Sequence, residues 1–434
     1  MIFFGNAILI ALLVYGLWQK SKGMPLERHF FLSLVVKVAA GLAVGLIYQY
    51  YYGYGDTLVL FKDGEVLRHI AVADFSRYVE FLFSRDYYEP QDITALLSNN
   101  NPRAIRFAKY ISAVNFLTNG NYWITSVYFS LFGFAGIWFC ANMLAHTVKG
   151  ASNAAAIAFF YFPSFVFWSS GILKESVLLG AIGGLTAILV PWVLGFREGK
   201  WKLSAPKVLL TIFLTYIIFK LKYYYLGGYL PAMMALALTT WLNGKFSFPE
   251  KRGMVLLVGI YFLVLFMSTK LHVNLQLENF LGVLVENTET MSRSTPNKEN
   301  LIIYHDLSPS VVSILKNLPK AYLEGTFRPY IWEEGNWLKK VASIENILLA
   351  AVLVLAALRL TKFKVCDQYR FLMLSGLLYI LLMTPLLAIA APNIGTLARY
   401  KAGFSPFLLF IVLVELLPKT ASKKILQEKT LSKV

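Results

Sequence analysis

Residues 122–146 read YWITSVYFSLFGFAGIWFCANMLAH, and no Asp, Glu, Lys or Arg interrupts this run. A transmembrane α-helix needs about 20 consecutive, predominantly apolar residues, so the run is long enough to cross a bilayer. Comparable apolar runs recur from the N-terminus to beyond residue 400. The sequence therefore predicts an all-α, polytopic bundle of transmembrane helices rather than a soluble domain.

Eleven such spans are predicted, and together they make residues 1–434 a single transmembrane domain. Some of them are shorter than a perpendicular crossing requires, which leaves their ends approximate. The predicted spans are residues 2–19, 29–50, 122–146, 152–170, 175–196, 207–220, 225–243, 254–271, 342–360, 370–391 and 403–417.

Composition excludes several other classes of protein. Hydrophobic residues make up 57% of the chain and charged residues 15%, against about 45–50% and about 25% in soluble domains. Two cysteines, Cys140 and Cys366, are too few for a disulfide framework or a cysteine metal cluster. The sequence contains no P-loop, dinucleotide-binding glycine fingerprint or zinc-type histidine cluster. We therefore expect no cofactor, and the sequence does not indicate a metal.

The net charge is +17, from 41 Lys and Arg against 24 Asp and Glu. We relate this charge to the orientation of the chain in a membrane, and we do not expect the protein to bind nucleic acid. Basic residues accumulate in the cytoplasmic loops of membrane proteins. Here they gather in alternate short loops and in the C-terminal tail, at Lys20, Lys22, Arg28, Lys149, Arg197, Lys200, Lys202, Lys207, Lys245, Lys251, Arg252, Arg359, Lys362, Lys364, Arg370, Lys419, Lys423, Lys424, Lys429 and Lys433.

This charge pattern predicts an N-terminus outside the cell membrane and a C-terminus in the cytoplasm. Two long loops, residues 51–121 and 272–341, then lie on the outer face. The first basic residue, Lys20, follows the first apolar run, whereas a signal peptide carries its positive charge before that run. We therefore expect residues 2–19 to be retained as a span.

The two outer loops are expected to be structured. Apolar residues with helical spacing predict amphipathic helices near residues 75–82 and 103–118, suited to the membrane interface. The second loop is polar over residues 286–300 and helical again near 308–323. The pattern of the first helix rests on Phe75, Tyr78, Val79 and Leu82.

The first candidate for chemistry is Asp56, which directly follows the second span. A carboxylate just outside the membrane can act as a general base on an acceptor hydroxyl. Asp56 or Thr57 can equally cap the helix that follows. Both interpretations stay open from spacing alone.

The second candidate lies in the tight turn between two spans, where Lys174 and Glu175 follow the small residues Ser169–Gly171. Ionisable groups at membrane depth are costly and normally serve a function. Lys174 can hold a phosphate as a point charge. The alternative is a lysine that reaches the surface and pairs with Glu175.

The third and fourth candidates are basic residues of the later outer segments. Arg328 can clamp phosphate oxygens, and Trp332 can stack on a sugar or prenyl unit; the alternative is a loop packed on the membrane surface. Arg399 and Lys401 together can form an anion site, or they can be the basic flank of the last span. Their predicted outer location is the side that positive charges avoid.

These motifs, in this order, resemble a group of bacterial multi-span glycosyltransferases of the GT-C superfamily. The resemblance covers most of residues 45–405, and its most specific part is Pro163–Glu175. It implies a lipid-linked sugar donor, generally a polyprenyl phosphate sugar, and a catalytic Asp in the first large outer loop, which corresponds to Asp56. The other segments that carry it are Arg106–Phe107, Leu117–Gly120, Arg328–Glu333 and Arg399.

We therefore expect a glycosyltransferase on the outer face of a bacterial inner membrane. It would move a sugar from a polyprenyl-(di)phosphate to a glycan, lipid or surface-polymer acceptor. Asp56 would be the base, and Lys174, Arg328 and Arg399 would border the same cavity and compensate the charge of the leaving phosphate.

Two alternatives stay open. A polysaccharide polymerase or ligase would use the arginines more than Asp56. A transporter or flippase for the same lipids would do no chemistry, and it would be expected to show internal repeats, which we do not find in the sequence.

Overall fold

The computed structural model describes residues 2–270, 276–359 and 367–417. Within these ranges the regular elements are helices, and the β-type pairing is one antiparallel bridge between Leu301 and Asn393. The chain divides into two compact units. Unit 1 comprises Met1–Asn142, Val166–Ala187 and Val208–Tyr224, and unit 2 comprises Met143–Phe165, Ile188–Lys207 and Tyr225–Val434.

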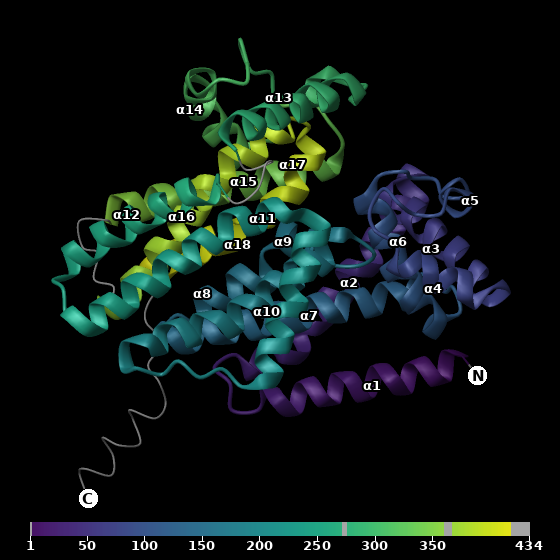
Figure 1. Cartoon of the computed structure of the whole chain (residues 1–434), viewed down its shortest axis with the longest axis horizontal. Coiled ribbons are helices and arrows are strands. Elements are labelled where there is room, and N and C mark those ends of the chain that lie inside the picture. The colour runs from purple at the N-terminus through teal and green to yellow at the C-terminus, as the bar shows by residue number, and fades with distance from the viewer. Residues whose placement is uncertain (1, 271–275, 360–366, 418–434) are drawn as a thin grey trace, which may run out of the picture. The chain divides into compact units, whose positions relative to one another are not determined.

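The helices follow one another along the chain as labelled in Figure 1. The first ten are α1 (Ile2–Ser21), α2 (Phe30–Leu46), α3 (Asp56–Ala73), α4 (Phe75–Phe83), α5 (Gln91–Thr94), α6 (Pro102–Thr118), α7 (Tyr122–Thr147), α8 (Ser152–Ala156), α9 (Pro163–Trp168) and α10 (Lys174–Gly195). The remainder are α11 (Ala205–Phe246), α12 (Glu250–Ser268), α13 (Leu277–Ser294), α14 (Val311–Phe327), α15 (Trp337–Arg359), α16 (Asp367–Ala390), α17 (Ile394–Lys401) and α18 (Ser405–Leu416).

Seven helices in the described part of the chain are long and apolar enough to cross a membrane, and the bent pair α17 and α18 makes an eighth if it counts as one span. The chain is therefore an all-α, multi-span membrane protein, as predicted, but the predicted count of eleven spans is not supported. The seven spans are Ile2–Ser21, Glu27–Tyr52, Tyr122–Thr147, Lys174–Glu198, Glu250–Ser268, Trp337–Arg359 and Tyr369–Ala390.

The three predicted spans that are missing lie where the helices are broken or bent. Residues 152–170 form α8, a π-helical turn at Ile157–Tyr161 and α9 instead of one helix. Pro163 cannot continue the preceding helix, because proline has no backbone N–H to donate to it. Residues 207–220 and 225–243 are two parts of α11, which bends at Lys222 with φ −154° and ψ 77°. Its first part, Ala205–Leu221, is shorter than a perpendicular crossing.

The membrane helices of unit 1 pack through small residues. A Cβ on Gly136 of α7 would lie 1.8 Å from the carbonyl oxygen of Gly180 in α10, so only glycine allows the two backbones to approach this closely. Helix α1 is mostly exposed, and polar contacts hold it in place. The Asn6 side-chain amide donates to the carbonyl of Leu117 at 2.9 Å, and its oxygen accepts from Tyr128 Oη at 2.7 Å.

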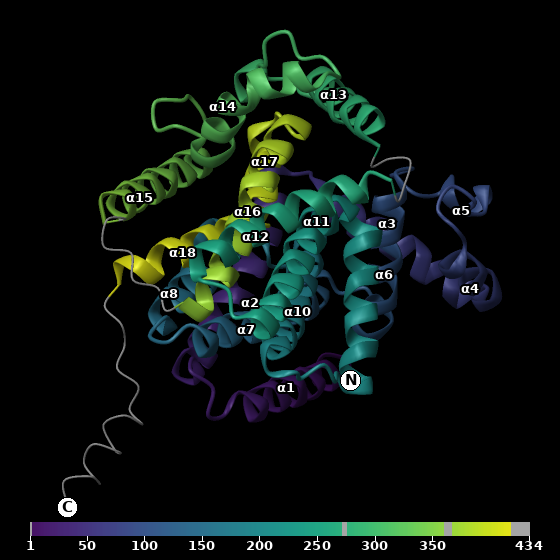
Figure 2. The same cartoon turned by 60° about the vertical axis from the view of Figure 1, so that its left-hand side comes forward.

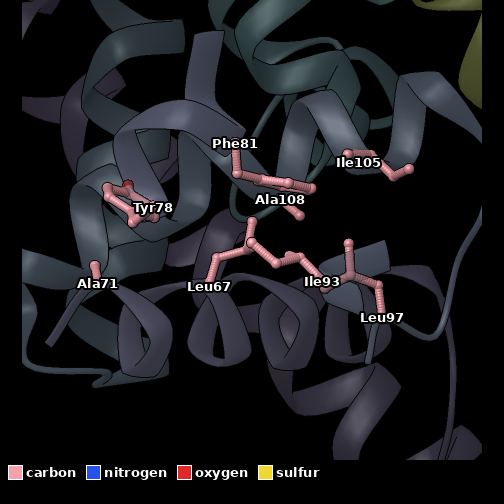
Figure 3. Close-up of a cluster of buried hydrophobic side chains, with 8 residues drawn as sticks. All are labelled: Leu67, Ala71, Tyr78, Phe81, Ile93, Leu97, Ile105 and Ala108. Carbon is pink, nitrogen blue, oxygen red and sulfur yellow. The ribbon is translucent and has the colours of Figure 1, made fainter. Parts of the chain in front are cut away.

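Helices α3, α4, α5 and α6 form a small globular body within unit 1, visible in Figure 1. Figure 3 shows side chains from all four helices, including Leu67, Phe81, Ile93 and Ala108, facing a common core. The predicted helices at 75–82 and 103–118 are confirmed. Tyr78 and Phe81 of α4 are buried in the core shared with α6, whereas Phe75 is 64% exposed. The expected position of both helices at the membrane interface stays a prediction.

Local capping sets the ends of these helices. Asp74 ends α3 and begins α4, where its side chain accepts from the backbone N–H of Arg77. Asn101 caps α6 in the same way through the N–H of Arg103. Helix α6 then stops at Asn119, which adopts the left-handed conformation with φ 49°.

In unit 2, α13 and α14 pack beside α16 and α17 (Figure 2). Their shared core contains Leu281, Ile314, Ala388 and Leu397, all buried. Residues 286–294, expected to be a polar segment, are the second half of amphipathic α13. The C-terminal tail that carries five of the predicted cytoplasmic lysines lies outside the described residues, as do Lys362, Lys364 and Cys366.

Candidate functional site

Asp56 is the first residue of α3 and is exposed. Gly55, with φ 144°, reverses the chain just before it and packs against the ring of Tyr48. Thr57 is buried and shares a hydrogen bond of 2.7 Å with Tyr122 Oη, which ties the start of α3 to α7. A carboxylate in the first turn of a helix is stabilised by the helix dipole. Gly55 occupies the N-cap position of α3, so Asp56 is not the capping residue, and its carboxylate lies exposed in the first turn.

Lys174 begins α10 and is half-buried, whereas Glu175 is buried. Glu175 pairs with a distant lysine, because its Oε1 lies 2.8 Å from Nζ of buried Lys222, at the bend of α11. A sequence pattern could not reveal this pair, whose members are 47 residues apart.

A second buried lysine lies close to the same turn. Lys37, in the middle of α2, donates to Ser169 Oγ at 2.5 Å. Ser130 Oγ accepts from the N–H of Gly171 at 2.9 Å, and Ser176 Oγ donates to the carbonyl of Gly171 at 2.8 Å. Such ionisable groups among apolar helices are a default functional hypothesis in membrane proteins.

In unit 2, the Arg328 guanidinium is occupied by acceptors of the protein itself. Its Nε donates to Glu333 at 2.7 Å, and Nη1 donates to Glu324 at 3.0 Å and to the carbonyl of Leu301 at 2.8 Å. Nη2 donates to the carbonyl of Glu299 at 3.1 Å. Burial would raise the pKa of Glu333, but hydrogen bonds from Lys339 and Arg328 hold it below its usual value. These hydrogen bonds fix the segment after α14 to the backbone around Leu301, where the antiparallel bridge with Asn393 lies.

Unit 2 contains three other candidates. Lys401 is buried at the end of α17 and donates to the Arg328 carbonyl at 3.1 Å and to Asn346 at 3.2 Å. Arg399 is half-buried in the last turn of α17. Trp332 is 74% exposed and stacks on Tyr330 with 4.8 Å between ring centroids.

The structure thus brings Arg328 and Lys401 together in unit 2, while Asp56 and Lys174 belong to unit 1. The single cavity expected for Asp56, Lys174, Arg328 and Arg399 stays a prediction.

Sequence reasoning missed a charged cluster in unit 1, which we call the Arg106 cluster. It consists of two carboxylates from the segment between α4 and α5, two cations of α6 and one of α11, at Asp86, Glu89, Arg106, Lys109 and Lys220.

Asp86 is the centre of the Arg106 cluster. One of its oxygens accepts from Arg106, and the other accepts from Lys220 at 2.9 Å. Lys109 Nζ lies 3.7 Å from Glu89 and donates to Ser84 Oγ at 3.2 Å. Three cations therefore share two carboxylates in a largely buried site.

Several polar atoms in the Arg106 cluster and in the adjacent Tyr110 lack a hydrogen-bond partner among the described residues. They are Arg106 Nε, Tyr110 Oη and Glu89 Oε1, and all three are buried. A buried polar group without a partner costs free energy, so such groups in a native protein call for an explanation such as a bound ion or ligand.

Burial also perturbs the ionisation of these side chains. It lowers the pKa of Lys109 to about 8, an effect that the nearby positive charge of Arg106 reinforces. Burial raises the pKa of the Tyr110 hydroxyl to about 12. One sequence signal could have pointed here, because Arg103, Arg106 and Lys109 recur at spacing i, i+3 and share one face of a helix.

Comparison with known proteins identifies no family for this chain, since no family model, curated protein or solved structure matches it. Helix length, apolar content and packing define its class as an all-α, multi-span membrane protein.

Proposed function

We propose that the chain is a glycosyltransferase of a bacterial inner membrane that takes its sugar from a polyprenyl-(di)phosphate donor. The observation that carries the proposal is the Arg106 cluster, where three cations and two carboxylates meet with unused hydrogen-bond donors. An enzyme that acts on a lipid phosphate needs cations in its site, because charge that develops on the leaving phosphate must be stabilised.

The proposed reaction is transfer of a sugar to a hydroxyl of a glycan, lipid or surface polymer. A carboxylate removes the proton of that hydroxyl, its oxygen bonds to the anomeric carbon, and the bond from that carbon to the phosphate oxygen breaks. Asp56 is the proposed base, supported by its exposure in the first turn of α3.

The remaining predicted phosphate ligands are supported to different degrees. Lys174 and Arg399 are half-buried, so part of each residue is accessible. The Arg328 guanidinium already donates to four protein acceptors. Arg328, Glu175 and Lys401 are therefore better suited to holding the site in shape, and exposed Trp332 to contacting a sugar or prenyl unit.

Transfer from a defined polyprenyl-linked sugar in liposomes tests the proposal, with Asp56→Asn as the main variant. Loss of a general base costs about 100–10,000-fold in rate. Asp74→Asn is the matched control, because Asp74 also begins a helix of the same loop and asparagine caps equally well. A near-normal rate for Asp56→Asn, with strong losses for Arg399→Ala, would favour the polymerase or ligase alternative.

The transporter alternative draws on a different observation, the buried Lys37 and the buried pair of Glu175 and Lys222 among apolar helices. Charged groups at such positions mark substrate or ion paths in transporters. Movement of the lipid across the bilayer without sugar transfer by the wild-type protein would select this alternative.

The proposed orientation places residues 51–121 and 272–341 on the outer face, with the N-terminus outside and the C-terminus in the cytoplasm. Labelling of intact cells with a membrane-impermeant thiol reagent tests it, using Ser98→Cys and Asn297→Cys, since both residues are exposed. Both variants should be labelled without permeabilisation. Labelling of one alone would show that the two loops face opposite compartments.

A further inference from the structure

The Asp86 carboxylate lies between two cations that come from different helices. Arg106 belongs to α6 and Lys220 to the first part of α11, and each donates to a separate oxygen of Asp86. Two cations that converge on one small carboxylate from two sides form the geometry with which proteins also bind a phosphate group.

Asp86 itself is held less firmly than Arg106. It belongs to a non-helical segment between α4 and α5, and its side chain is 28% exposed, against 8% for Arg106. The next residue, Tyr87, adopts the left-handed region with φ 69°, which is costly for a residue with a Cβ. The segment can therefore relax when it moves, whereas the two cations are fixed on helices.

The cluster also has hydrogen-bonding capacity that Asp86 does not use. Arg106 Nε and Tyr110 Oη donate to no acceptor among the described residues, although both are buried. Arg106 Nη1 reaches Tyr216 Oη at only 3.5 Å, the long limit of a hydrogen bond. An anion with more oxygens than a carboxylate would use these donors.

We propose that the carboxylate of Asp86 occupies the place of a phosphate group, and that a phosphate or diphosphate anion displaces it and binds to Arg106 and Lys220. The inference rests on the proposed function only in naming the lipid-linked donor as one source of this anion. Inorganic diphosphate presents the same chemistry and is the other source.

The test measures binding of inorganic diphosphate to the full-length protein in detergent, by calorimetry and by the rise in the unfolding temperature. The wild-type protein must break two ionic contacts of Asp86 before the anion binds. Asp86→Asn removes the competing charge and keeps the shape, so it should bind diphosphate about tenfold more tightly. A gain in affinity distinguishes this role from a supporting one, because a site loses affinity for its ligand when a carboxylate that supports the site is replaced.

The chain offers a matched control. Asp92 pairs with Arg77 at 2.7 Å in the same body of helices, but both side chains are well exposed. Asp92→Asn should leave diphosphate affinity unchanged. A second change, Lys220→Met, should remove the gain in the Asp86→Asn background, because it deletes one of the two ligands of the anion.

Equal or weaker binding by Asp86→Asn, or equal gains for Asp86→Asn and Asp92→Asn, would overturn the proposal. If Asp86→Asn does not fold, Lys220→Met in the wild-type background decides the question, since unchanged affinity there would equally overturn it.

Polyprenyl phosphate in nanodiscs, run beside inorganic diphosphate, distinguishes the two sources of the anion. Tighter binding by Asp86→Asn together with no sugar transfer from any donor would keep this inference and reject the proposed function. Sugar transfer by a protein whose Asp86→Asn variant gains no affinity would do the reverse.

Discussion

Arg106 in unit 1 and Arg328 in unit 2 are both largely buried arginines with carboxylate partners, yet they differ in what the protein provides for them. Every nitrogen of the Arg328 guanidinium donates to a protein acceptor, two of which are backbone carbonyls. Arg106 has one strong partner, Asp86, and its Nε donates to no acceptor among the described residues. A guanidinium saturated by its own chain stabilises the fold, whereas one with unused donors can bind a ligand.

The largest expected effect is on stability, and it separates the two arginines. Arg328→Met leaves Glu324, Glu333 and two carbonyls without a donor, so we expect a loss of about 3–5 kcal/mol in the free energy of unfolding. Arg106→Met should cost about 1–2 kcal/mol, because Asp86 keeps Lys220. Denaturant titration of the detergent-solubilised variants measures both. A larger loss for Arg106→Met would reverse the comparison.

An intermediate effect is expected from pH, through Lys109. This side chain faces Glu89, Arg106, Lys220, Ser84 and the ring of Phe81. Its pKa of about 8 means that the amine loses its charge as pH rises through that value. Diphosphate binding should therefore weaken by up to about tenfold between pH 7 and pH 9.

Calorimetry across this pH range measures the change, with Lys109→Met as the control, in which the part of the pH dependence that Lys109 causes should be absent. The same residue has the opposite effect on folding. Because the unfolded chain binds more protons between pH 8 and about 10.4, the contribution of Lys109 to stability rises with pH over that window. A diphosphate affinity that is flat from pH 7 to pH 9 would exclude Lys109 from the site.

The smallest expected effect is at Trp332. Its side chain is 74% exposed and packs on one face of Tyr330, so Trp332→Ala should change the free energy of unfolding by less than about 0.5 kcal/mol. If Trp332 contacts the sugar or prenyl unit, the same variant should raise KM for the donor. A loss of stability above about 1.5 kcal/mol would instead show that Trp332 helps to hold the fold around Arg328.

The sequence predicted what depends on local pattern. Apolar runs identified seven crossing helices, and helical spacing identified α4 and α6. It failed where tertiary packing decides. The apolar face of α4 has the same spacing whether it meets a membrane or α6, and only the fold reveals that Tyr78 is buried. Apolar content also could not reveal that α11 bends at Lys222.

For the candidate site, the sequence showed which residue types could bind a phosphate, but it did not show which groups each residue contacts in the fold. As an arginine, Arg328 was a reasonable candidate for a phosphate ligand. Its hydrogen-bond acceptors, however, include backbone carbonyls, which a sequence motif of side chains does not reveal. The Arg106 cluster combines residues up to 134 positions apart, as in the contact of Asp86 with Lys220. Pairing over such distances follows from the packing of helices, so spacing along one segment could not predict it.

The contact between Lys37 and Ser169 also constrains the order in which the chain assembles during synthesis. A lysine at the centre of a span costs about 2.5–3.5 kcal/mol on insertion, and Ser169 follows it by 132 residues. At a translation rate of 5–20 residues per second, α2 waits roughly 7–26 s for this partner. This contact of a buried lysine therefore forms only after the Ser169 turn has been made.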